Sequence, residues 1–93
     1  MIKSFAYRRT QELYVSGRAR GFPTDIIRRA IRKLDYVNFA TKLDDLRVPP
    51  GNQLHALTGD RNGQYAISIN DQWRICFRFD DGDANDVEIC DYH

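Results

Sequence analysis

The order of apolar and polar residues changes midway along the chain. Before residue 47 the apolar residues recur every three or four positions, whereas after residue 53 they alternate with polar ones. The first spacing is typical of one face of a helix, and the second is typical of a half-buried strand. The sequence therefore predicts helices in its first half and strands in its second half.

Two helices are predicted. The first spans residues 9–16 and ends at Gly17, a residue type that suits the left-handed conformation after a helix. The second begins at Thr24, whose hydroxyl is expected to cap its first turn. An apolar stripe on one face predicts packing against a core and comprises Ile27, Ala30, Ile31, Leu34 and Val37. The basic residues lie off this stripe and are expected to face solvent or a partner: Arg28, Arg29, Arg32 and Lys33.

The predicted strands lie before and after the helices, at residues 2–6, 53–57, 64–69 and 73–79 and around Val87 and Ile89. Segregated helices and strands indicate an α+β domain. We expect one domain over residues 1–93, in which an N-terminal strand and two helices pack on one face of a mainly antiparallel sheet (β-α-α-β-β-β).

The clearest alternation lies in residues 73–79. If Trp73 and Phe77 point into the core, Arg74 and Arg78 must point to the opposite face of the sheet. By the same parity Glu88, Cys90 and Tyr92 of the last strand share the face of Arg74. The sheet is therefore expected to gather polar side chains on the face that the helices leave open.

The turn before the last strand decides which residues pair. A connection of three residues sets Arg74 across from Cys90, and one of five residues sets it across from Tyr92. A plain two-residue hairpin at Asp81-Gly82 reverses the parity of the core residues, so we do not expect it.

Composition adds the cellular setting and the kind of partner. The opening residues 1–5 lack the pattern of a signal peptide, and no apolar run reaches the about 18 residues that span a membrane, so a cytoplasmic protein without a membrane partner is expected. The net charge is only +1, yet 11 of the 14 Lys and Arg residues lie in the first 47 positions. Such a surface suits phosphates or an acidic partner, and a solvated helix surface explains it equally well.

The two cysteines, Cys76 and Cys90, are too few for a disulfide framework. Together with His55 and His93 they match none of the usual zinc-ligand spacings. We therefore expect neither a resident metal nor a cofactor.

Four segments of the chain together form a recognisable pattern: Pro50-Gly51-Asn52-Gln53-Leu54-His55-Ala56-Leu57, Gly59-Asp60-Arg61-Asn62-Gly63, Asn70-Asp71-Gln72-Trp73-Arg74-Ile75-Cys76-Phe77 and Asp86-Val87-Glu88-Ile89-Cys90-Asp91-Tyr92-His93. The combination of a Trp-Arg-Ile-X-Phe strand and a terminal Asp-Tyr-His is specific, and the pattern also covers the opening residues 1–5. These segments resemble the HigB branch of the RelE superfamily, also known as plasmid maintenance system killer or GraT-like toxins.

This resemblance implies the toxin of a type II toxin–antitoxin system with a RelE-like fold. Such a toxin enters the A site of the small ribosomal subunit, cuts messenger RNA there and inhibits translation. The resemblance also implies a HigA-type antitoxin that carries a helix-turn-helix domain, with operator DNA contacted only through that antitoxin.

The resemblance further implies a metal-free general acid–base centre. RNA cleavage needs a base for the ribose 2′-oxygen, positive charge at the phosphate and an acid for the departing 5′-oxygen. Histidine suits either proton-transfer role near neutrality, and the order of the two histidines stays open. The implied catalytic residues are His55, Arg74, Asp91, Tyr92 and His93, and the implied RNA contacts are Arg61, Arg78 and Tyr92.

Simpler interpretations exist for these residues. Without the resemblance, the position of His55 between Leu54 and Ala56 favours an ordinary strand histidine. Arg74 is equally explained as a cross-strand partner of Glu88. Arg61 could cap its loop, Tyr92 could cover the sheet edge, and the end of the chain could be a solvated tail.

One departure from the family pattern bears on the rate. Some HigB and RelE toxins carry a lysine where this chain has Thr58, and threonine supplies neither a cation nor a base near neutral pH. A mild toxin is therefore a reasonable hypothesis. Two other functions remain open: a ParE-like gyrase inhibitor, and a non-catalytic toxin that interferes with ribosome function or assembly.

Overall fold

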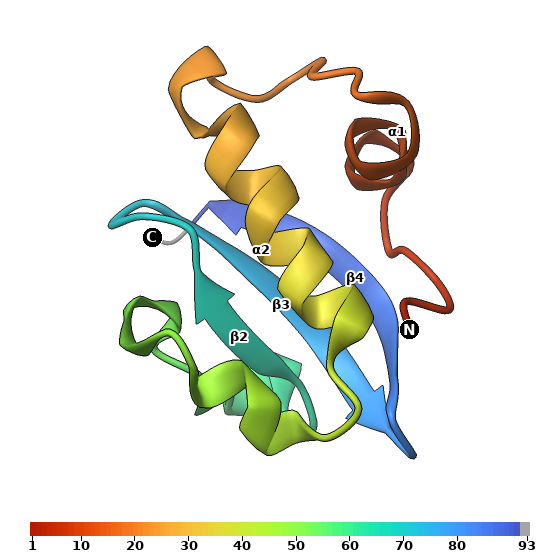
Figure 1. Cartoon of the computed structure of the whole chain (residues 1–93), viewed down its shortest axis with the longest axis vertical. Helices are drawn as coiled ribbons and strands as arrows, with labels where there is room; N and C mark the ends of the chain where they lie inside the picture. Colours follow the sequence, from red (N-terminus) through yellow and green to blue (C-terminus); the bar gives the residue numbers. More distant parts are fainter. Residues whose placement is uncertain (92–93) are drawn as a thin grey trace.

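The computed structural model describes residues 1–91 (Figure 1). Helices α1 and α2 precede a four-stranded antiparallel sheet in the order β1-β2-β3-β4, as predicted. The elements are α1 (Arg8–Ser16), α2 (Ile27–Phe39), β1 (His55–Ala56), β2 (Tyr65–Ser68), β3 (Trp73–Asp80) and β4 (Asp83–Asp91). Short 3₁₀ turns connect them: η1 (Thr24–Ile26), η2 (Leu43–Arg47), η3 (Pro50–Asn52) and η4 (Gly59–Arg61).

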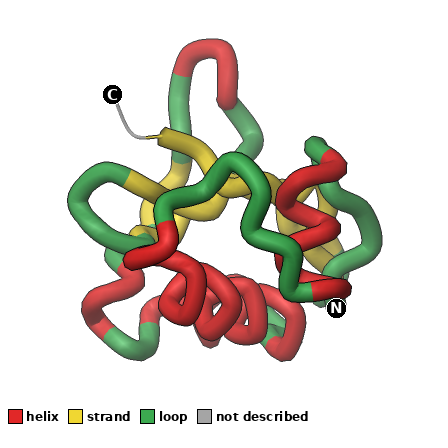
Figure 2. Tube along the Cα trace, turned by 90° about the horizontal axis from the view of Figure 1, so that it is seen from above, coloured by secondary structure: helices red, strands yellow, loops and turns green. Residues whose placement is uncertain are grey.

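Helix α2 crosses one face of the sheet, over β3 and β4 (Figure 1). Seen from above, it lies along one side of the strands (Figure 2). Its predicted stripe forms the core, since Ala30, Leu34 and Val37 are fully buried and Ile27 and Ile31 pack against them. The strands contribute the inward residues of the predicted alternation: Ile67, Ile69, Trp73, Ile75, Phe77, Val87 and Ile89.

The end of α1 follows the prediction, and the start of α2 does not. Gly17 has φ 73°, and its N–H donates to the Leu13 carbonyl at 3.0 Å. At the second helix Thr24 opens the 3₁₀ turn η1 and α2 starts only at Ile27, with no side-chain capping bond at Pro23 or Ile26. The expected hydroxyl cap of Thr24 is therefore wrong, because that residue lies inside the first turn.

Lys33 is a second correction, because it is buried at 7% exposure instead of facing solvent. Its Nζ donates to Asn52 Oδ1 at 2.6 Å, and Asn52 Nδ2 donates in turn to the Leu46 carbonyl at 3.1 Å. Burial, with Arg29 and Arg32 nearby, lowers the pKa of Lys33. A position at the edge of the apolar stripe explains the difference, since the long apolar stem packs inward while the ammonium finds an acceptor.

The expected N-terminal strand is reduced to two isolated parallel bridges, Ile2 with Ala84 and Phe5 with Val87. Backbone bonds still fix this segment, for example from Lys3 N–H to the Ala84 carbonyl at 2.8 Å. The segment follows β4 without joining the sheet as a regular strand.

The β3–β4 connection corrects the predicted turn. Asp80 pairs with Asp83, so the turn holds two residues, Asp81 and Gly82, both with positive φ. The core residues of the two strands still face the same side, because β4 contains one extra residue further along. The register shifts between Cys76 and Arg78, and the extra residue on β4 is Asp86, with φ 53°. Such a bulge moves the following residues of a strand by one position.

The bulge produces the register that the three-residue alternative predicted. Arg74 pairs with Cys90, and Ile75 pairs with Ile89 in the core. One of the two predicted pairings was therefore correct, but the turn length given for it was wrong.

Candidate functional site

Two rows of paired residues run across the face of the sheet opposite the core residues. In the first row His55 pairs with Ala66, Ala66 with Cys76 and Cys76 with Glu88. In the second row Ser68 pairs with Arg74 and Arg74 with Cys90. Paired residues point to the same face, so the register places His55 and Arg74 together on the side away from α2. The alternation predicted this face for Arg74, whereas His55 was proposed from the family resemblance.

A cavity of about 280 Å³ opens on this face and brings three predicted site residues together. His55 contributes from β1, Arg61 from η4 and Arg74 from β3. The wall also holds Thr58, the position at which the family resemblance implied a lysine in some toxins. Among the described residues that line it there are two arginines and no carboxylate, so this cavity favours an anionic group.

His55 is exposed, which leaves its ring available to a bound molecule. Its Nδ1 lies 2.9 Å from the Gln53 carbonyl oxygen. A carbonyl oxygen only accepts hydrogen bonds, so this contact requires the proton on Nδ1. In the neutral ring Nε2 then carries the free lone pair, which is the state that a general base needs.

Arg61, not Arg74, is the ion-pair partner of Glu88. The Arg61 NH1 and Glu88 Oε1 atoms are 2.5 Å apart, and the Glu88 side chain is only 6% exposed. Arg61 NH1 also donates to Gln64 Oε1 at 3.0 Å. The predicted alternative of an Arg74–Glu88 pair is therefore replaced by a pair that holds Arg61 at the edge of the cavity.

A small apolar cluster closes part of the face that was expected to be open. Leu57, Ala66 and Cys76 are buried there, with Cys90 packed against them. The neighbouring Cys90 thiol, together with the cations Arg61 and Arg74, outweighs burial and lowers the pKa of Cys76 to about 7. This buried cluster occupies the middle of the face, so the accessible polar side chains lie beside it.

Two further cavities flank the first one. One of about 520 Å³ shares Arg61 and is lined also by Arg78, Asp60 and Asp86. The other, of about 220 Å³, shares His55 and includes Asp71. Both neighbours contain carboxylates, whereas the described lining of the central cavity contains none.

The remaining predicted residues lie outside the central cavity. Arg78 is on the same face but belongs to the larger flanking cavity, where its Nε lies 3.6 Å from Asp86 Oδ2. Asp91 pairs with Trp73, and its Oδ2 accepts a bond from Gln72 Nε2 at 3.3 Å. Tyr92 and His93 lie outside the described residues.

Sequence reasoning missed the part played by Glu88. It assigned this residue to the correct face, but the partner it offered, as the simpler alternative for Arg74, was the arginine of the neighbouring strand. The loop between β1 and β2 brings Arg61 over the sheet instead, and no periodicity in that loop signals its path.

Comparisons with known proteins agree on the class of molecule. The family model for the RelE-like toxin of the type II toxin–antitoxin system HigB matches residues 3–93. The crystal structure of a YafQ mutant from E. coli has a similar fold, with a TM-score of 0.56 and 16% identity, covering 91% of this chain and 84% of that one. The chain therefore has the fold of the RelE-like toxins.

Two relatives narrow this class. Endoribonuclease HigB of Proteus vulgaris is 36% identical over 93 residues, which is the full length of both chains. Toxin HigB-1 of Vibrio cholerae is 39% identical over 67 residues, covering 72% of this chain and 70% of that protein. The chain belongs to the HigB family of RelE-like toxins of type II toxin–antitoxin systems. A toxin of this type works with an antitoxin as its partner.

Within residues 1–91, none of the helices combines the length and the apolar character that crossing a bilayer requires.

Proposed function

We propose that this toxin is an endoribonuclease that cuts messenger RNA in the A site of the small ribosomal subunit by metal-free acid–base chemistry. The observation that carries the proposal is the cavity that joins His55, Arg61 and Arg74, with no carboxylate among its described lining residues. A cavity with two guanidinium groups suits a phosphodiester, and an imidazole beside them suits proton transfer. The full-length match to an endoribonuclease supports the same activity.

His55 is assigned the role of general base. Its Nδ1 is engaged by the Gln53 carbonyl, so Nε2 is the atom that takes the proton of the ribose 2′-hydroxyl. The 2′-oxygen then attacks the phosphorus, and the bond to the 5′-oxygen breaks. Arg74 holds the phosphate oxygens as negative charge builds on them.

The general acid is assigned to the last residues of the chain. In this proposal His93 protonates the departing 5′-oxygen, Asp91 orients that imidazole, and Tyr92 stacks on a base or donates a hydrogen bond. These roles follow the family resemblance.

Binding of the RNA on either side of the scissile phosphate is assigned to two arginines, Arg61 and Arg78. Arg61 borders both the central and the larger cavity, and Arg78 lies in the larger one. A strand that passes from one cavity to the other would meet both cations. The carboxylates of the larger cavity, Asp60 and Asp86, would repel any further phosphate there.

The proposal places residues 1–93 in the cytoplasm as a single toxin domain. A HigA-type helix-turn-helix antitoxin would neutralise it and would carry the complex to operator DNA. A neighbouring reading frame for such a protein is the first observation to seek.

The decisive variant is Arg74→Ala, with Arg28→Ala as its matched control on the exposed side of α2. Cleavage of messenger RNA on programmed ribosomes should fall about 10²–10³-fold for Arg74→Ala, the loss typical of one donor to a developing oxyanion, and should not change for Arg28→Ala. Full growth arrest by Arg74→Ala would refute the assigned site.

Measurements after induction of the toxin distinguish cleavage from the alternative functions. Messenger RNA ends mapped inside codons after induction would support cleavage. Intact messages with altered ribosome profiles would indicate a non-catalytic toxin, and trapped gyrase with intact messages would indicate a ParE-like inhibitor.

A further inference from the structure

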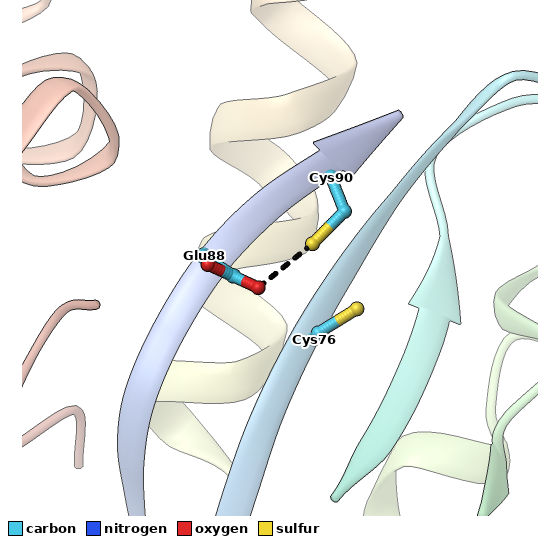
Figure 3. A group of neighbouring side chains, drawn as sticks. All are labelled: Cys76, Glu88 and Cys90. Carbon is cyan, nitrogen blue, oxygen red and sulfur yellow. Dashed lines mark hydrogen bonds between the residues drawn. The ribbon is translucent and has the colours of Figure 1, made fainter. Parts of the chain in front are cut away.

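We infer that Cys76, Glu88 and Cys90 form a binding site for a divalent, thiol-seeking metal ion of the zinc type, separate from the RNA-cleaving centre. The three residues lie on β3 and β4, and their potential ligand atoms all lie within 4.8 Å of one another. Figure 3 shows the Cys90 sulfur and the Glu88 carboxylate facing each other, with the Cys76 sulfur beside them on the neighbouring strand.

The register explains why these side chains converge. Cys76 pairs directly with Glu88, and Cys90 follows two positions further along β4 on the same face. Tetrahedral zinc with a Zn–S distance of about 2.3 Å holds two sulfur ligands about 3.8 Å apart. The potential ligand atoms now lie at most 4.8 Å apart. Side-chain rotations that bring them about 1 Å closer together are therefore enough for them to bind one ion.

A disulfide fits this register less well than an ion does. Cys76 and Cys90 are diagonal neighbours across the two strands, and such pairs have Cα atoms about 7–8 Å apart. Disulfides usually need about 4.4–6.8 Å between these atoms. Both cysteines are free in the structure, and a metal can bridge the longer distance because it adds two bonds to sulfur.

The charge of the cluster also fits a divalent ion. With both thiols protonated, the Glu88 carboxylate is balanced by the Arg61 guanidinium at 2.5 Å. A divalent ion that displaces the two thiol protons to solvent adds two positive charges and leaves two thiolates, so the balance is unchanged. A monovalent ion that displaced both protons would leave one uncompensated negative charge in a buried place, where it is costly.

The polar contacts leave a path for the exchange. Cys90 Sγ donates to Glu88 Oε1 at 3.0 Å, and this proton is one of the two that the ion replaces (Figure 3). Cys76 is fully buried and Glu88 nearly so, whereas Cys90 is partly exposed. The ion would therefore enter from the Cys90 side, with water as its fourth ligand.

The experiment uses the purified full-length protein in a reductant that does not bind metals, with Zn²⁺ and Cd²⁺ as probes. Equilibrium dialysis should show one Zn²⁺ per chain, and Cd²⁺ should give the ultraviolet absorption of thiolate-to-metal charge transfer. Zn²⁺ should also protect both cysteines from alkylation. Uptake below one tenth of an equivalent, or Cd²⁺ bound without that absorption, would overturn the inference.

Variants locate the site. Glu88→Gln should weaken Zn²⁺ binding at least about tenfold, whereas Glu12→Gln, the chain's other glutamate, should leave it unchanged. Cys76→Ala with Cys90→Ala should abolish it, and Cys90→Ala alone serves if the buried substitution prevents folding. Equal binding by the two glutamine variants, or retention without cysteines, would refute the site. Because the readout is metal uptake, this outcome does not depend on whether the toxin cuts RNA.

Discussion

The two faces of the sheet are built from the same strands by different means. On the face under α2, Ile67, Ile75 and Ile89 pair in one row and are buried to 2% exposure or less. On the other face, the row of Ala66, Cys76 and Glu88 is equally inaccessible but contains a thiol and an ion pair. The first face holds the fold together through apolar area, whereas the second holds polar groups in place around a cavity.

This difference teaches where each kind of substitution should act. The helix-covered face is expected to set the free energy of unfolding, and the rim of the other face is expected to set the rate of cleavage. Glu88 belongs to both descriptions, because it is buried and also positions Arg61 at the cavity.

The largest expected effect is on catalysis. His55→Ala should lower the single-turnover rate of cleavage on programmed ribosomes about 10²–10⁴-fold, the usual contribution of a general acid or base. Its side chain is exposed, so the midpoint of thermal unfolding should not change. A variant that unfolds at a lower temperature but cleaves at the wild-type rate would show that His55 serves the fold and not catalysis.

The next effect is on folding. Leu34→Ala removes a fully buried side chain from the core beneath α2 and should cost about 2–5 kcal/mol of unfolding free energy. Chemical denaturation measures this loss. The folded fraction should retain the wild-type cleavage rate, and a slower rate per folded molecule would show that the two faces are coupled.

A smaller and mixed effect is expected at the shared residue. Glu88→Gln leaves Arg61 without its charged partner, and we expect a loss of about 1–3 kcal/mol. The value stays below that of a fully buried pair because Arg61 is 35% exposed. A loss of cleavage that exceeds the loss of stability would show that Glu88 acts by positioning Arg61.

The smallest effect concerns the cavity wall. Thr58→Lys adds a cation beside Arg61 and Arg74 and should accelerate single-turnover cleavage by less than about tenfold, since one partly screened charge contributes about 1 kcal/mol. Thr58→Gln is the control for side-chain length. No acceleration by lysine would count against the hypothesis that this threonine makes the toxin mild.

The sequence predicted most of what repeats along the chain. The stripe of α2 and the alternation of β3 identified the core, and the same parity placed Arg74 on the face where His55 lies. What it did not predict depends on single residues. Lys33 is buried because Asn52, far along the chain, offers an acceptor, and Arg61 meets Glu88 because a loop without periodicity folds over the sheet.

The extra residue at Asp86 has a consequence for comparing homologous chains. Because it follows a two-residue turn, adding or deleting one residue between Arg78 and Glu88 would exchange the two faces for everything that comes after it. Ile89 would then face solvent, and Cys90 would face the helices. Insertions and deletions in this hairpin should therefore occur in even numbers across the family, or be accompanied by loss of the bulge.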